Sequence, residues 1–406
     1  MLKKIPVREL RIGMYLHKLD ASWIHHPFWR SAFVITEQTD IEKLLSSGIH
    51  TVIIDTSKGD DVSPAPQEPP PEIPSTPAAD KAPPTATQQT SIAEELEQAA
   101  HICAKANREV KGMFQEARLG KAVDSEQAMS LVSDISSSVS RNSGALISLA
   151  RLKNYDDYTY MHSVAVCGLM IALAMQLNMN DEEVRLCGLA GLLHDIGKMH
   201  IPMNIINKPG KLTDEEFDTV RHHPEAGHAL LSNSLNIHPI VLDVCLHHHE
   251  KIAGTGYPHQ LAGNNISLYA RMGAVCDVYD AVTSDRIYHK GWHPAEALRN
   301  MAEWTTDHLD NRIFQALVKS LGIYPIGSLV RLQSGRLAVV IDKNPTSLLN
   351  PVVKAFFSIK SGTRIKPEIL KLGTSSCQEK IIAIEQPEDW KFPDFNLLWT
   401  NGIQHP

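Results

Sequence analysis

The sequence has little that would suit a secreted or membrane protein. Its six cysteines form no Cys-x-x-Cys pair, which favours reduced core thiols over a disulfide framework or a thiolate-rich zinc site. The longest apolar run, Val164 to Met175, is too short to cross a bilayer and predicts a buried helix. The first residues lack the apolar segment of a signal peptide. We therefore expect a cytoplasmic protein without a membrane partner.

Positive charge is also scarce. The 406 residues include 39 Lys and Arg against 46 Asp and Glu, which gives a net charge of −7. Binding to a nucleic-acid backbone needs clustered Lys and Arg, so no nucleic-acid partner is expected. A small anionic substrate held by metal ions is compatible with this charge. Histidine is abundant instead, with 20 residues, many of them between His162 and His293.

Proline divides the chain. Nine of the 24 prolines fall between Pro64 and Pro84, in a composition that cannot bury a core, so residues 59–90 are predicted to be a linker. Residues 1–58 before it are predicted to form a small α+β domain. Its expected elements are short strands at 15–16, 33–35 and 51–54 and a helix at 40–47.

Residues 91–150 have the pattern of a helical hairpin or coiled coil. In the first helix, apolar residues recur in steps of four and three: Ile92, Leu96, Ala99, Cys103, Ala106, Val110, Met113 and Ala117. Ser91 and Glu94 resemble a capping box at its start. Such a seam packs against another helix, either within the chain or across a homodimer formed through 91–150.

The remainder divides into a helical domain, 151–321, and a β extension with a tail, 322–406. The helices are predicted at 155–179, 181–193, 214–231, 239–249 and 268–284. After Tyr324, alternating residues around Ser334-Gly335 predict a hairpin, and the tail after Gln378 is expected to be irregular. The predicted class is therefore mainly α, with a small N-terminal α+β domain and a short C-terminal β extension.

The sequence from Leu193 to Lys198 reads Leu-His-Asp-Ile-Gly-Lys. His194 and Asp195 stand at the end of an apolar helical run, and we expect Gly197 to end that helix as a C-terminal glycine. Adjacent side chains on a helix project about 100° apart, so both can reach one side of a cleft. An imidazole and a carboxylate in that position suit a divalent metal ion.

Further imidazoles and carboxylates fall on or at the ends of the predicted helices. The candidate metal ligands are His162, His194, Asp195, His223, His248, His249 and Asp277. Groups of these types suit iron or manganese. Seven are too many for one ion and fit two divalent ions, with Asp195 as the bridge between them.

Several motifs together resemble one family, the HD-GYP domains. They are His194-Asp195-Ile196-Gly197-Lys198, Lys208-Pro209-Gly210, His248-His249-Glu250, Gly254-Thr255-Gly256-Tyr257-Pro258, Asp277-Val278-Tyr279-Asp280-Ala281 and Ser284-Asp285-Arg286-Ile287-Tyr288. The resemblance covers about Tyr155 to Leu321. The N-terminal stretch is similar to a small domain that often precedes HD-GYP domains, and the β extension resembles their usual tail.

The resemblance implies an HD-type metallohydrolase: a bacterial metal-dependent phosphodiesterase that opens cyclic di-GMP to pGpG and, in many members, GMP, through a hydroxide held by two metal ions. Lowering this second messenger would affect motility and biofilm formation. The seven candidate ligands match the family's metal ligands. Lys198 would offset charge on the scissile phosphate, Arg286 would contact the substrate phosphate, and the loop containing Gly256 and Tyr257 would shape the substrate pocket.

The resemblance also distinguishes the candidate metal-binding histidines from the other histidines. His222, His228, His238, His247 and His259 lack the family match and suit surface or hydrogen-bonded roles. His223 is preferred to His222 because it begins His-Pro-Glu-Ala-Gly.

Three positions depart from the family pattern. Ala253 stands where an Asp usually precedes the Gly-x-Gly-Tyr-Pro loop, which removes a carboxylate that could hold the loop. Tyr158 occupies the place of a Glu that serves a third metal in some members, and this favours two ions. His289 replaces a basic residue, so a second phosphate contact depends on Lys290.

Two alternatives follow from these departures and from the wider HD proteins. One is a catalytically weak cyclic di-GMP-binding adaptor that acts through diguanylate cyclase domains. The other is a hydrolase of another nucleotide. Asp280 supports Asp277 or the loop in one interpretation and packs between helices in the other.

Overall fold

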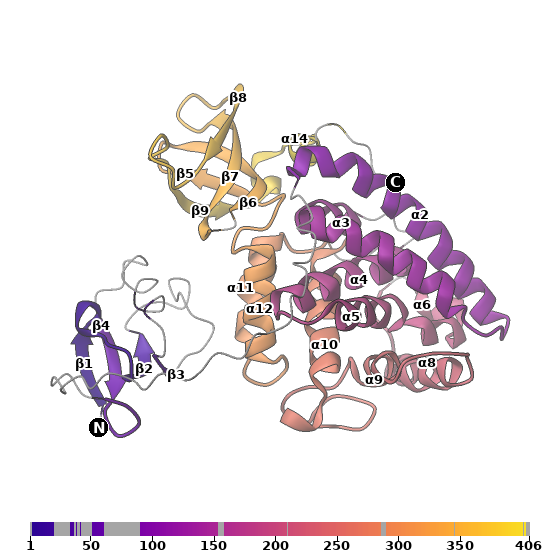
Figure 1. The fold of residues 1–406 in the computed structure, drawn as a ribbon. Helices are drawn as coiled ribbons and strands as arrows, with labels where there is room; N and C mark the ends of the chain where they lie inside the picture. The colour runs from indigo at the N-terminus through magenta and orange to yellow at the C-terminus, as the bar shows by residue number, and fades with distance from the viewer. Residues whose placement is uncertain are drawn as a thin grey trace, which may run out of the picture. The chain divides into compact units, whose positions relative to one another are not determined.

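The computed structural model describes residues 2–19, 33–35, 38, 41, 51–60, 90–152, 158–208, 210–285, 290–344, 346–400 and 402. The chain folds as two compact units, residues 1–86 and 87–406 (Figure 1). The predicted helix at 40–47 falls outside the described residues except for Ile41.

The N-terminal unit contains a small antiparallel sheet. Its strands are β1 (Leu2–Pro6), β2 (Tyr15–Leu19), β3 (Phe33–Val34) and β4 (Thr51–Asp55), in the order β1-β4-β2-β3, with a 3-10 turn η1 (Val7–Glu9) after β1. Ile5, Leu16 and Ile54 form part of its core. Strand β1 was not predicted, because Leu-Lys-Lys at an exposed edge gives no clear apolar alternation.

Helices α2 (Ile92–Arg118) and α3 (Ser125–Arg151) form the predicted hairpin. The backbone N–H of Ser91 donates to Glu94 at 2.9 Å, as expected for a capping box. The apolar seam of α2 is buried in the core that this helix shares with α3 and α4 (Tyr158–Gln176). The seam therefore packs within the chain.

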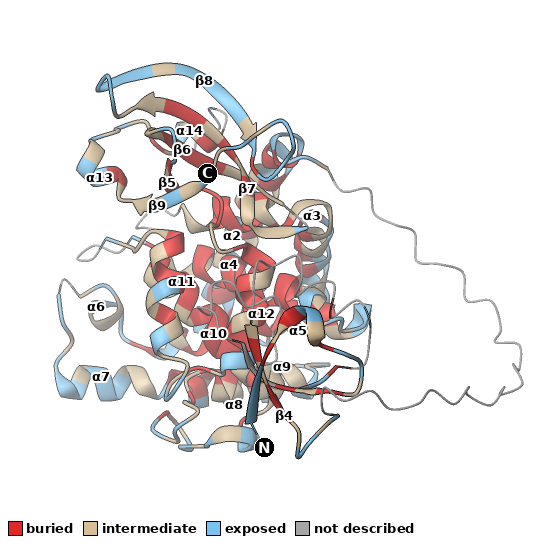
Figure 2. Cartoon of the chain, turned by 90° about the vertical axis from the view of Figure 1, so that its left-hand side faces the viewer, coloured by how far each residue is buried: buried red, intermediate tan, exposed pale blue. Residues whose placement is uncertain are grey.

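The centre of the larger unit is α4, which is buried along most of its length, and α5 (Asp181–Leu193) packs against it (Figure 2). Helix α4 is long and apolar enough to cross a membrane, but 78% of its most apolar window is buried inside the protein. It behaves as the predicted core helix. The remaining helical elements of the described domain are η4 (Ile196–His200), α6 (Met203–Ile206), α7 (Asp214–Arg221), α8 (His223–Ser232), α9 (Pro239–His247), η5 (Gly263–Asn265), α10 (Leu268–Thr283), α11 (Pro294–Glu303) and α12 (Asn311–Leu321).

One helix prediction was wrong. The single helix expected at 214–231 is two helices, α7 and α8, separated at His222. Pro224 has no backbone N–H to continue the α7 hydrogen bonds, so it favours the first turn of a new helix. The break puts His223 at the start of α8, where its side chain faces inward.

The β extension is a five-stranded antiparallel sheet in the order β8-β7-β6-β5-β9. The strands are β5 (Leu329–Leu332), β6 (Arg336–Asn344), β7 (Ser347–Ser358), β8 (Thr363–Lys371) and β9 (Ile381–Glu385). Ser334-Gly335 makes the predicted turn between β5 and β6. The irregular tail was a wrong prediction, since it contains β9 and the short helices α13 (Pro387–Trp390) and α14 (Leu397–Thr400). The mainly helical class with two small sheets is confirmed.

Candidate metal centre

Seven polar side chains converge at the ends of the core helices. His162 comes from α4, His194 and Asp195 follow α5, His223 begins α8, His248 and His249 follow α9, and Asp277 lies on α10. Their ligand atoms form two groups, each with its atoms within 4.8 Å of one another: His162, His194 and Asp277 in one, and Asp195, His223, His248 and His249 in the other. These are the seven groups predicted from the sequence.

Asp195 lies between the two groups. Its Oδ2 is 3.4 Å from Nε2 of His162 and 3.4 Å from Nε2 of His194. Its Oδ1 is 3.2 Å from Nε2 of His223 and 3.7 Å from Nε2 of His248. Each carboxylate oxygen therefore faces one group, which is the arrangement that a bridging ligand needs.

The protein fixes the orientation of four imidazoles by hydrogen bonds at Nδ1. His194 donates to the Gly191 carbonyl at 2.8 Å, His223 to Val220 at 2.7 Å, and His248 to Val244 at 3.0 Å. His162 donates to Oδ2 of Asp280 at 2.6 Å. With the proton on Nδ1, the Nε2 lone pair points into the cluster and is free to bind a metal ion. Asp280 thus orients the candidate ligand His162, a partner that neither interpretation named, and its support of Asp277 or the loop stays a prediction.

The cluster leaves polar atoms that a cation would satisfy. Nε2 of His194 and Oδ1 of Asp195 are buried without a hydrogen-bond partner. Nε2 of His223 and Nε2 of His248 lie 3.3 Å apart, although both rings already use Nδ1 as the donor. Two facing lone pairs and a carboxylate oxygen without a partner are unfavourable when buried. A bound cation would satisfy all of them, so these side chains fit metal ions.

Burial and the mixture of charges shift the pKa values in the cluster. Burial lowers the pKa of His248 to about 3, so this imidazole is neutral. Burial would raise the pKa of the Asp195 carboxyl, but the positive charge of Lys198 opposes it, and the pKa lies well below its ordinary value. A neutral imidazole and an ionised carboxylate are the protonation states in which these groups bind metals.

Gly197 permits the close contact that brings His223 to Asp195. A Cβ at this position would lie 1.9 Å from the His223 carbonyl oxygen and 2.5 Å from the Gly227 nitrogen. The prediction that Gly197 ends α5 was wrong, because the helix ends at Leu193 and Gly197 lies inside η4. Its missing side chain lets η4 pack directly on the backbone of α8.

The loop after α9 carries Gly256 and Tyr257 to the edge of the cluster. The Tyr257 ring stacks on His249, with ring centres 4.7 Å apart. A Cβ on Gly256 would lie 2.4 Å from the Lys251 nitrogen, so the loop folds back here without room for a side chain. Both predicted pocket residues therefore lie beside a candidate ligand.

A buried carboxylate that was not predicted holds this loop. Glu250 is 2% exposed, and its two oxygens accept the backbone N–H groups of His259 at 2.7 Å and Leu261 at 3.0 Å. These bonds close the loop although Ala253 supplies no carboxylate. The sequence points to Glu250 only by its place after the candidate ligands His248 and His249. The motif gives Glu250 no role of its own.

We expect Glu250→Gln to lower kcat/KM for the substrate about tenfold without changing metal content, because hydrogen bonds to charged groups contribute about 1.5–3 kcal/mol. Glutamine replaces one acceptor oxygen with an NH₂ group that faces a backbone donor. Steady-state kinetics and metal analysis measure the two quantities, with the exposed Glu225→Gln as control. An unchanged kcat/KM would show that Glu250 does not hold the loop in its working form.

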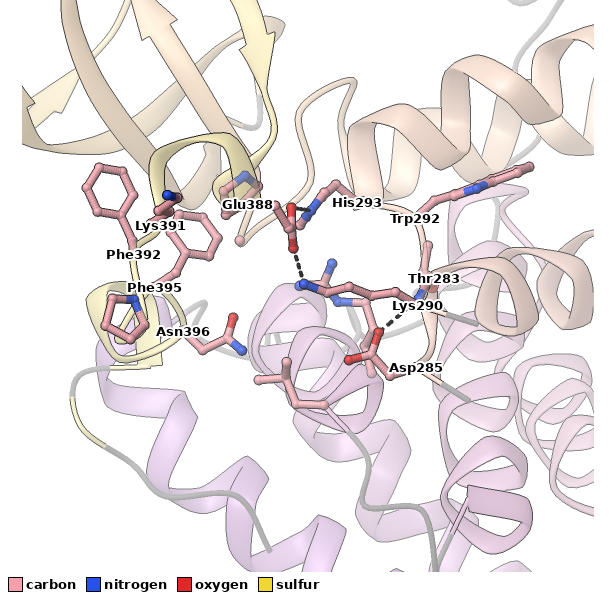
Figure 3. Close-up of a pocket in the computed structure, with 16 residues that line it drawn as sticks. Thr283, Asp285, Lys290, Trp292, His293, Glu388, Lys391, Phe392, Phe395 and Asn396 are labelled. Atoms are coloured by element: carbon pink, nitrogen blue, oxygen red, sulfur yellow. Dashed lines mark hydrogen bonds and ion pairs between the residues drawn. The ribbon is translucent and has the colours of Figure 1, made fainter. Parts of the chain in front are cut away.

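The other three predicted residues lie in different places. Lys198 forms an ion pair with Oδ2 of Asp195. Lys290 pairs with Glu388 of α13 in the wall of a cavity of about 670 Å³, and His293 donates to the same carboxylate at 2.8 Å (Figure 3). Arg286 lies outside the described residues.

Four of the five histidines judged poorer candidates have other partners. His222 is exposed and pairs with Glu225, while His238 accepts the Ile240 N–H at the start of α9. His247 binds Asp243 and contacts His259. None of these four belongs to either group of candidate ligands among the described residues.

Comparison with known proteins gives consistent matches. Residues 137–313 match the HD domain family, and residues 2–128 match a domain of unknown function. A cyclic di-GMP phosphodiesterase of Pseudomonas aeruginosa is 51% identical over 98% of this chain and 96% of its own length. A cyclic di-GMP phosphodiesterase response regulator of Xanthomonas campestris is 41% identical over 38% of this chain and 40% of its own.

Two further matches concern a related nucleotide and a solved structure. A 3'3'-cGAMP-specific phosphodiesterase of Vibrio cholerae is 34% identical over 40% of this chain and 38% of its own length. The structure of an HDG"Y"P protein from Bdellovibrio bacteriovorus aligns with a TM-score of 0.47 and 19% identity, over 78% of this chain and 98% of that one.

Proposed function

The chain belongs to the HD-domain family of cyclic di-GMP phosphodiesterases, and from this membership we propose that it hydrolyses cyclic di-GMP to pGpG. The observation that carries the proposal is the carboxylate of Asp195, which has one oxygen facing each of two ligand groups. A binding protein without catalysis has no need of such a bridge.

We propose that the centre holds two divalent ions, iron or manganese. His162, His194 and Asp277 would bind one ion, and His223, His248 and His249 the other, with Asp195 shared. Histidine nitrogens and carboxylates without thiolates support this choice of metals. When bound, such a pair lowers the pKa of a coordinated water and neutralises charge on the phosphate oxygens.

The other residues position the substrate and balance its charge. Lys198 pairs with Asp195 and is 26% exposed at its side chain, so its ammonium group can turn to a phosphate oxygen and oppose negative charge there. Gly256 and Tyr257 line the substrate side of His249. Arg286 is proposed to contact the phosphates, and Lys290 would do so only after leaving its ion pair with Glu388.

A cyclic GMP-AMP dinucleotide is the second candidate substrate, because a relative of 34% identity in this region carries that specificity in its name. Both molecules present two phosphodiesters and at least one guanine. A hydrolysis assay that includes both dinucleotides separates the two functions.

The experiment that tests the function uses two adjacent histidines. We expect the protein reconstituted with manganese or iron to convert cyclic di-GMP to pGpG, measured by chromatography, and His223→Ala to lose about 10²-fold or more of that rate, as when a main electrostatic contributor is removed. His222→Ala is the matched control, because His222 is exposed and its ring pairs with Glu225. Absence of turnover in the reconstituted wild type, or equal loss in both variants, would contradict the proposal.

The location, partners, oligomeric state and domain boundaries of the enzyme are also proposals. We place it in the cytoplasm, where reduced cysteines are stable, and infer that diguanylate cyclase domains are its partners. A homodimer through 91–150 would have to use a face other than the buried seam of α2. The domain boundaries near residues 58, 90, 150 and 321 remain predictions.

A further inference from the structure

A cation at the rim of the metal centre has no role in the reaction described above. Arg221, the last residue of α7, precedes the candidate ligand His223 by two positions. Its guanidinium carbon lies 5.2 Å from the centre of the Tyr257 ring. Because Tyr257 stacks on His249, a continuous stack joins the guanidinium of Arg221 to the ligand cluster.

The Arg221 guanidinium is half-buried and has no carboxylate partner among the described residues. The nearby Glu225 is engaged by His222 at 2.8 Å. A guanidinium whose face lies on an aromatic ring keeps its edge available, and that edge presents a planar fork of N–H donors. The fork is therefore available to a pair of acceptors on a bound ligand.

An exposed aromatic ring lies beside the same guanidinium. Phe217, one turn earlier on α7, has its ring centre 6.0 Å from the guanidinium carbon and is 48% exposed. Exposed aromatic rings next to cations are the surfaces on which nucleobases stack. Arg221 and Phe217 together offer a donor fork and a stacking surface at the edge of a centre for a dinucleotide.

We propose that Arg221 recognises one guanine base of the substrate, with its fork donating to O6 and N7, and that Phe217 offers the adjacent stacking surface. Guanine presents two acceptors at this edge, whereas adenine presents an acceptor and a donor. The contact would therefore select guanine over adenine. This inference rests on the proposed cyclic di-GMP phosphodiesterase function.

The test compares cyclic di-GMP with its 7-deaza analogue, in which a C–H group replaces N7. The wild type is expected to prefer cyclic di-GMP about tenfold in kcat/KM, and Arg221→Ala to lose about tenfold to a hundredfold on cyclic di-GMP, through KM, the range of one bidentate Arg–guanine pair. In the variant the preference over the 7-deaza analogue disappears. Hydrolysis of bis(p-nitrophenyl) phosphate, which has no base, stays unchanged.

Two controls keep the outcome specific. Arg221→Lys retains the charge without the fork and is expected to lose the N7 preference as well, while Arg185→Ala, an exposed arginine on α5, is expected to behave as wild type. A preference for N7 that persists in Arg221→Ala overturns the inference, as does an equal loss on the small diester, which would mean that Arg221 acts through the metal centre. A wild type that hydrolyses the small diester but not cyclic di-GMP overturns the proposed function instead.

Discussion

Asp195→Ala is expected to lower cyclic di-GMP hydrolysis about 10³-fold or more, the upper range for removal of one main electrostatic contributor, and to reduce the bound metal. Asp195 is fully buried and faces both ligand groups, so its removal takes a ligand from each ion at once. Steady-state kinetics and elemental analysis of the purified variant measure the two effects.

The control for Asp195→Ala is Asp218→Ala, which removes an exposed carboxylate from α7 and is expected to leave rate and metal content unchanged. Asp195→Asn keeps the size of the side chain and separates loss of charge from loss of packing. If Asp195→Ala binds a full complement of metal and turns over near the wild-type rate, the shared carboxylate has no part in the chemistry.

Gly197→Ala is expected to have a large effect although it adds one methyl group. Its Cβ would lie 1.9 Å from the carbonyl oxygen of His223, and because the obstacle is backbone, α8 must move away. A displacement of about 1 Å in a positioned group can cost about 10²-fold in rate, and overpacking of this kind costs about 1–3 kcal/mol of stability or more. Activity and thermal unfolding check both effects.

Gly112→Ala is the matched control for this glycine. Gly112 lies inside α2, and a Cβ added there would meet no neighbouring atom within 4 Å. Alanine in a helix interior is favoured over glycine by about 0.5–1 kcal/mol, so this variant is expected to be slightly more stable and fully active. A Gly197→Ala protein that unfolds and reacts like the wild type would mean that the close contact with α8 is not needed.

The candidate ligands could be predicted because they fall on or at the ends of amphipathic or buried helices. The apolar pattern before His194 identifies α5, and its final residue, Leu193, is where the structure ends the helix. Asp277 falls within α10 and His162 in the first turns of α4. Where the spacing of apolar residues in a helix and a sequence motif indicate the same residues, residue type and spacing are sufficient to propose a site.

The features that the sequence did not reveal depend on contacts between distant segments. Glu250 binds a loop about ten residues away, and Gly197 is required by the backbone of α8. Arg221 has an ordinary place at the end of a charged helix, and only the position of Tyr257 gives it a role. Strand β9 pairs with β5 about 50 residues earlier in the chain, which no local alternation can indicate with certainty.

We propose that Asp195 bridges two metal ions held by six further ligands. The most direct measurement is anomalous X-ray diffraction from crystals of the manganese-loaded protein. We predict two anomalous peaks about 3.5–4 Å apart, the separation usual for paired catalytic ions, one on each side of the Asp195 carboxylate. A single peak in this cluster, or two peaks that do not share Asp195, would contradict the claim.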